Sequence, residues 1–155
     1  MSILAVYGVE DLQCPRRVLT HRQDIETELA AMGITLLPAG APVTPGAQCK
    51  HECHGAPAYE QPEECIDGAQ VFVCGALERR IERGRVRLCL LSESSVLLIA
   101  LRAGDRLTLP AGLSQCMLPT PGDTCSWVDT AAAESDLAYQ PVPQSALVML
   151  APLEV

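Results

Sequence analysis

Apolar residues in the second half of the chain fall into short runs of strand length. Turn-forming residues, including Gly84, Gly104-Asp105 and Pro121-Gly122, separate these runs. Many short strands with such breaks are typical of an antiparallel barrel or sandwich. The predicted strands cover residues 70–74, 81–91, 95–101, 106–109, 116–118 and 125–128.

The first half begins with a predicted strand at residues 3–7, followed by a predicted helix over residues 21–32. Ile25, Leu29 and Met32 recur at the spacing of one helix face, and Gly33 stands where a helix commonly ends. This short amphipathic helix is expected to lean on the barrel. A last apolar strand is predicted at residues 146–150.

Residues 38–68 differ in composition from the rest, with Pro, Gly, Cys, His and Glu in place of branched aliphatic residues. Neither helix nor strand is specified there, so we predict a long irregular segment. No internal repeat and no linker divides the chain, which predicts one domain over residues 1–155, mostly β, with one or two short N-terminal helices.

The 155 residues carry a formal net charge of −8. This charge is unfavourable for nucleic acid and for anionic membranes, so we expect neither as a partner. The N-terminus lacks the pattern of a signal peptide, and no apolar run is long enough to span a membrane. These features predict a cytoplasmic protein.

Eight cysteines are many for such a chain. Without an export signal, reduced thiols are the expected state. Cys74, Cys89 and Cys116 lie in apolar, strand-like surroundings and are predicted to be small buried hydrophobic residues.

The most specific local pattern is residues 104–115, GDRLTLPAGLSQ. It resembles the second cupin motif, G-x5-P-x-G-x2-H, with every spacing kept and the final histidine replaced by Gln115. The stretches Val18-Leu19-Thr20-His21 and Asp24-Ile25, and the closing residues 151–154, are similar to acireductone dioxygenases. The resemblance implies a small antiparallel cupin-type β-barrel, or jelly roll.

The same resemblance places the first cupin motif, H-x-H-x3-E-x6-G, on residues 71–84. Gly84 matches its closing glycine, but Val71, Val73 and Leu77 stand where that family binds its metal. Val and Leu offer no lone pairs, and the amide of Gln115 is a weak ligand. We therefore expect true acireductone dioxygenase activity to be absent at that location.

Two residues are candidates for binding a substrate. Arg79 stands where the resembled family places an arginine that helps bind its acidic substrate, and Gln115 replaces the last metal ligand. A buried guanidinium at Arg79 can hold an enolate or carboxylate. The alternative, a solvated arginine in the run Glu78-Arg79-Arg80, is equally compatible with the sequence.

A second cluster of ligand-type side chains lies in the irregular segment. The motif Cys49-x3-Cys53 with interleaved histidines could form a thiolate–imidazole site for zinc, copper, iron or nickel. The alternative is a solvated polar loop. The candidate ligands are Cys49, His51, Cys53, His54 and Cys65, with Glu60, Glu63 and Glu64 nearby.

Three functions follow from these patterns. The first, ranked slightly above the second, is a metal-dependent, dioxygenase-like oxidoreductase acting on a small thiol- or enol-containing metabolite. The second is a non-catalytic cupin that binds a metal or small ligand. The third is a structural protein, expected to form a homodimer, whose dry barrel is filled by Val71, Val73 and Leu77. Catalytic residues are not identified by the sequence.

Overall fold

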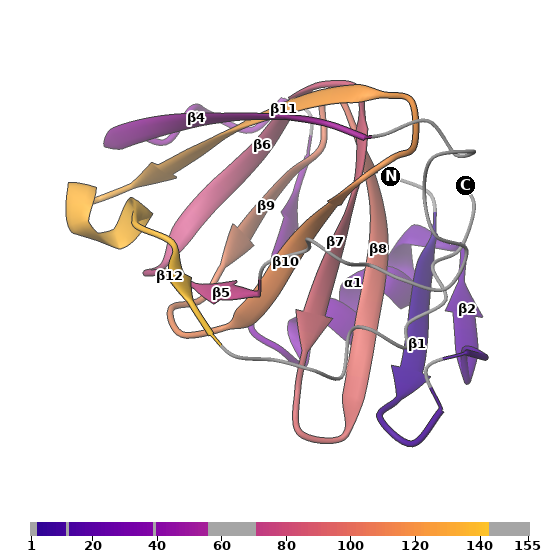
Figure 1. Ribbon diagram of the computed structural model, residues 1–155. Coiled ribbons are helices and arrows are strands. Elements are labelled where there is room, and N and C mark those ends of the chain that lie inside the picture. Colours follow the sequence, from indigo (N-terminus) through magenta and orange to yellow (C-terminus); the bar gives the residue numbers. More distant parts are fainter. Residues whose placement is uncertain (1–2, 12, 39, 56–70, 143–155) are drawn as a thin grey trace.

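The computed structural model describes residues 3–11, 13–38, 40–55 and 71–142, and in this part the chain forms two antiparallel sheets (Figure 1). The first sheet has seven strands, in the spatial order β12 (Gln140–Pro141), β5 (Phe72–Val73), β10 (Ser114–Pro119), β7 (Arg85–Leu91), β8 (Ser95–Arg102), β1 (Leu4–Gly8) and β2 (Arg17–Leu19). The second has five, in the order β3 (Thr35–Leu37), β9 (Arg106–Leu109), β6 (Leu77–Arg83), β11 (Thr124–Ala131) and β4 (Ala47–His54).

The larger hydrophobic cluster joins the two sheets. It combines Leu88 and Ile99 from the seven-stranded sheet with Ile81, Leu107 and Trp127 from the five-stranded sheet, all buried. Because side chains alternate between the faces of a strand, their neighbours form a second cluster on the other face of the seven-stranded sheet. That cluster contains Ala5, Tyr7, Val71, Cys89, Leu91, Val96, Leu98, Cys116 and Leu118.

The predicted helix is confirmed as α1 (Arg22–Ala30). Ile25 and Leu29 face the core, as their spacing predicted, and the amides of Gly33 and Ile34 bond the last carbonyls of the helix. The second helical element is a 3-10 turn, η2 (Glu134–Leu137), which follows β11 instead of lying near the N-terminus. In the described part of the chain, no helix is long and apolar enough to cross a membrane.

The predicted strands of the second half are confirmed, with the run 81–91 divided into β6 and β7 at Gly84. Gly84 has φ +73, and a Cβ at this position would lie 2.2 Å from the carbonyl oxygen of Thr124. This close approach requires glycine and fixes the turn between β6 and β7 against β11. The strand predicted at residues 146–150 lies outside the described residues.

The prediction of an irregular segment at residues 38–68 is wrong for residues 47–54, which form β4. This strand pairs along its whole length with β11. Its side chains alternate strictly between half-buried and exposed, with Cys49, His51 and Cys53 on the inner face. Cysteine and histidine occupy positions where aliphatic residues usually mark a strand, and this hid the two-residue period from the sequence.

Candidate functional site

A buried ion pair forms the centre of the site. Arg79 on β6 and Asp129 on β11 are directly opposed residues, and both side chains are 0% exposed. Arg79 Nε donates to Asp129 Oδ1 at 2.8 Å, and Nη2 donates to Oδ2 at 3.2 Å. Burial alone lowers the pKa of Arg79, but the charge of Asp129 and its hydrogen bonds outweigh burial and raise that pKa, so the guanidinium stays charged.

The remaining donors of Arg79 also have partners. Nη1 donates to Gln115 Oε1 at 2.6 Å and approaches Met117 Sδ at 3.6 Å, while Nη2 also donates to Tyr139 OH at 3.0 Å. The amide of Gln115 reaches Cys74 Sγ at 3.6 Å. The structure therefore brings the two predicted substrate-binding residues together, and the alternative of a solvated Arg79 is wrong.

Tyr139 connects the ion pair to the indole of Trp127. Its hydroxyl donates to Asp129 Oδ2 in a short hydrogen bond and accepts one from Trp127 Nε1 at 3.0 Å. Burial raises the pKa of Tyr139 above its usual value, so the phenol stays protonated. We call Arg79, Gln115, Asp129, Trp127 and Tyr139 the interior polar cluster.

His51 on β4 lies at the more accessible end of this cluster, with its side chain 25% exposed. Its ring stacks on Tyr139, with centroids 4.5 Å apart, and on Trp127, at 5.4 Å. Tyr139 in turn stacks on Phe72 at 3.9 Å, which makes a column of four rings. Aromatic residues are only 3% of the chain, and three of them gather here.

The Nε2 atom of His51 is buried and has no hydrogen-bond partner, and it lies 3.7 Å from Asp129 Oδ2. Burial lowers the pKa of His51, with the charge of Arg79 adding to this effect and that of Asp129 opposing it. The imidazole is therefore neutral at pH 7. A proton on Nε2, facing the carboxylate, leaves the lone pair on Nδ1.

The predicted metal ligands do not come together in the described part of the chain. Cys49, His51 and Cys53 share the inner face of β4, whereas His54 is on the outer face, where Nδ1 lies 2.8 Å from Thr124 Oγ1. No group of three His, Cys, Asp or Glu side chains able to hold a metal occurs among the described residues. Cys65, Glu60, Glu63 and Glu64 lie outside them.

The cupin metal positions also do not suit a metal ion. Leu77 packs in the core between the sheets, Val71 belongs to the cluster on the other face, and Val73 is half-buried. None of these side chains has a donor atom, and the amide oxygen of Gln115 is taken by Arg79. The hypothesis of a dry barrel filled by Val71, Val73 and Leu77 is likewise wrong, because the interior holds a charged network.

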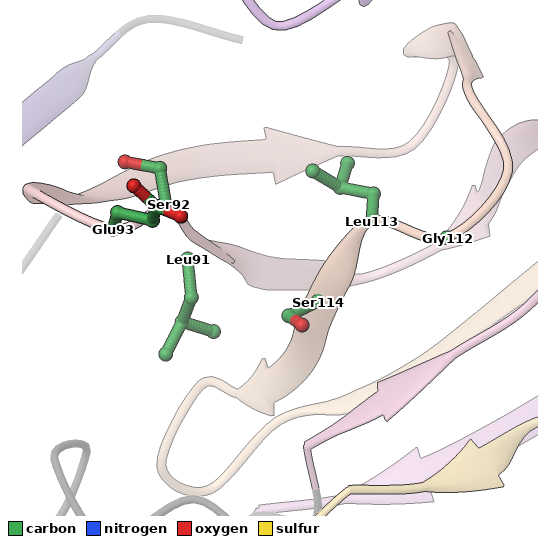
Figure 2. Close-up of a pocket in the computed structure, with 6 residues that line it drawn as sticks. All are labelled: Leu91, Ser92, Glu93, Gly112, Leu113 and Ser114. Carbon is green, nitrogen blue, oxygen red and sulfur yellow. The ribbon is translucent and has the colours of Figure 1, made fainter.

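A separate pocket of about 340 Å³ lies where β7 ends and β10 begins. Figure 2 draws the residues that line it. Leu91, Ser92, Glu93, Gly112, Leu113 and Ser114 line it. It is open to solvent and shares no residue with the interior polar cluster. Its one charged residue, Glu93, gives it little chemistry beyond a surface groove.

Asp129 and Tyr139 were missed by the sequence analysis. The only sequence signal for Asp129 is that it is the one charged residue of strand β11. Tyr139 lies 60 residues from Arg79 and reaches it because η2 turns the chain back after β11. Only the fold shows that these groups meet.

No family model matches the sequence, and no curated protein matches it. Among solved structures, the acireductone dioxygenase from Bacillus anthracis with a cadmium ion in its active centre superposes with a TM-score of 0.63. The two chains are 9% identical, and the similarity covers 92% of this chain and 98% of the other. Identity this low shows the fold alone, which is mostly β and of the cupin type.

Proposed function

We propose that this protein is a cupin that binds a small metabolite at the His51 end of the interior polar cluster, without the metal of its structural neighbour. One observation carries the proposal: the imidazole of His51 is 25% exposed and lies at the end of a buried cluster whose other polar groups bond one another. The ligand would reach the exposed part of the imidazole.

The chemistry of the cluster favours a small enol- or hydroxyl-containing ligand. Arg79 is neutralised by Asp129, so it contributes little net charge for holding a free anion. Neutral His51 offers one acceptor nitrogen at the edge of a ring that Tyr139 and Trp127 hold by stacking, which suits a ligand that donates a hydroxyl group. Arg79 and Gln115 then act as positioning residues, because they hold Tyr139 and Asp129 in place.

Trp127 supplies a direct readout, because it is the only tryptophan of the chain and stacks on His51. We expect catechol, a planar enediol that is uncharged at pH 7, to change Trp127 fluorescence saturably and at equilibrium. His51→Ala abolishes the change, whereas His54→Ala, on the opposite face of β4, retains it. Binding should persist through pH 6.5 and decline below it, since protonation of His51 removes the acceptor.

A response that His51→Ala leaves intact would refute this site. An equal loss of the fluorescence change in His51→Ala and His54→Ala would also refute it, because only His51 belongs to the ring column. A thermal-unfolding trace of each variant confirms that the protein titrated is folded.

A second candidate is a metal-dependent oxidoreductase that acts on a thiol- or enol-containing metabolite. The observation in its favour is that Cys49, His51 and Cys53 share one face of β4. Iron, nickel, zinc or copper would then need Cys65 or another ligand from residues 56–70. This candidate predicts dioxygen uptake by Fe(II)-treated protein that Cys53→Ala abolishes; uptake that is unchanged in Cys53→Ala excludes it.

A further inference from the structure

Cys53 and Cys125 face each other on the inner side of the five-stranded sheet. They are directly opposed residues of β4 and β11, and their Sγ atoms lie 2.8 Å apart as free thiols. Opposed residues of antiparallel strands have Cα atoms about 4.5–5.5 Å apart. That spacing falls within the range of disulfides, about 4.4–6.8 Å. The backbone is therefore already placed for an S–S bond.

The two sulfurs differ in access. Cys53 is half-buried on β4, the edge strand of its sheet, while Cys125 is 0% exposed. Cys53 is thus the sulfur that a reagent reaches first, and Cys125 is the partner that resolves the adduct.

We propose that Cys53 and Cys125 form a reversible intramolecular disulfide, which makes this pair a redox modification site for low-molecular-weight disulfides such as oxidised glutathione. The thiolate of Cys53, its proton released to water, attacks one sulfur of the oxidant, whose S–S bond breaks and releases one thiol. Cys125 then loses its proton and attacks Cys53 Sγ, which expels the second thiol. Two cysteine thiols are oxidised while one disulfide is reduced to two thiols.

The disulfide would fasten edge strand β4 to β11 beside the ring column. His51 and Trp127 form the next opposed pair on this face, two residues from Cys53 and Cys125. The link would join positions 72 residues apart, and closing a loop of that size restrains the unfolded chain strongly. Oxidation should therefore raise the melting temperature by several degrees. This inference stands independently of the proposed ligand.

Cys89 and Cys116 provide an internal control. They are also directly opposed, on β7 and β10, but both are 0% exposed. Their mutual hydrogen bond and burial raise the pKa of Cys89 well above its usual value. Cys89 and Cys116 are opposed in the same way as Cys53 and Cys125, but a reagent cannot reach them from solvent. We therefore predict that this pair stays reduced while the protein is folded.

The test uses the full chain with Cys14→Ser and Cys65→Ser, so that neither of these thiols competes. The protein is incubated with oxidised glutathione, blocked with N-ethylmaleimide and mapped by mass spectrometry without reduction. We expect a Cys53–Cys125 linked peptide, a higher melting temperature that dithiothreitol reverses, and alkylatable Cys89 and Cys116 after unfolding. Cys53→Ser should abolish the link and leave Cys125 unmodified.

A stable glutathione adduct on Cys53, a linked peptide joining other cysteines, or no reaction would each overturn the proposal. The half-buried Cys53 is the position to substitute, because serine there disturbs the core less than at Cys125. None of these readouts requires ligand binding, so the proposed function can fail while this site is confirmed.

Discussion

Arg79 and Asp129 show how a single pair of residues sets the chemistry of the interior. A guanidinium and a carboxylate with no exposure are stable only when each satisfies the other and their further hydrogen bonds are made. Here Gln115 and Tyr139 complete the set. Gln115, which stands at the last metal-ligand position of the resembled motif, thus bonds an ion pair made by the protein itself.

Removal of one partner should be strongly destabilising. Asp129→Asn leaves the Arg79 cation buried without its counter-charge, and we expect a loss of about 3–5 kcal/mol in the free energy of unfolding. The matched control is Glu82→Gln, which breaks the partly exposed pairs of Glu82 with Arg80 and Lys50 and should change stability by less than about 1 kcal/mol. Urea denaturation measures both.

The double variant Arg79→Met, Asp129→Leu separates charge from shape. Because it removes both ions together, it should be more stable than Asp129→Asn. If the double variant is no more stable than Asp129→Asn, the unpaired charge of Arg79 is not the cause of the lost stability.

At this scale the sequence identified two of the five residues of the interior polar cluster. Arg79 and Gln115 were predicted from their motif positions, and the structure places them 2.6 Å apart between Nη1 and Oε1. Asp129 and Tyr139 could not be predicted, since their contacts with Arg79 span 50 and 60 residues. Long-range pairing of this kind has no local signature.

At the scale of elements, the pairing of distant strands in the five-stranded sheet places the cluster. β6 and β11 hold Arg79 opposite Asp129, and β4 on the other side of β11 holds His51 opposite Trp127 (Figure 1). Aliphatic periodicity identified β7, β8 and β9, but not β4, whose inner positions are Cys and His. The strands β2, β3 and β12 have two or three residues each, too short for periodicity to identify.

The β6–β7 turn offers a test of this arrangement. Gly84→Ala combines a left-handed backbone with a Cβ 2.2 Å from the carbonyl oxygen of Thr124, whereas Gly104→Ala has a positive φ but no atom within 4 Å. The left-handed conformation costs about 1–2 kcal/mol in either variant. We expect Gly84→Ala to be the more destabilising in thermal unfolding; equal losses would show that β11 does not pack closely on this turn.

For the whole molecule, the fold was predicted better than the function. The second cupin motif and the spacing of turns led to the correct architecture, which the acireductone dioxygenase structure shares at 9% identity. Function could not be derived in the same way, because one fold supports many different reactions. The positions that bind the metal in the resembled motifs hold other residues in this chain. The interior has to be interpreted from its own side chains.

The central proposal is that the interior polar cluster binds its ligand without a metal ion. Its most direct test is the metal content of the full chain purified from metal-replete cells, measured by elemental analysis together with His51→Ala and Cys53→Ala. We predict far less than one metal ion per chain, unchanged in both variants. One iron, nickel, zinc or copper ion per chain, lost on substitution of His51 or Cys53, would contradict the claim.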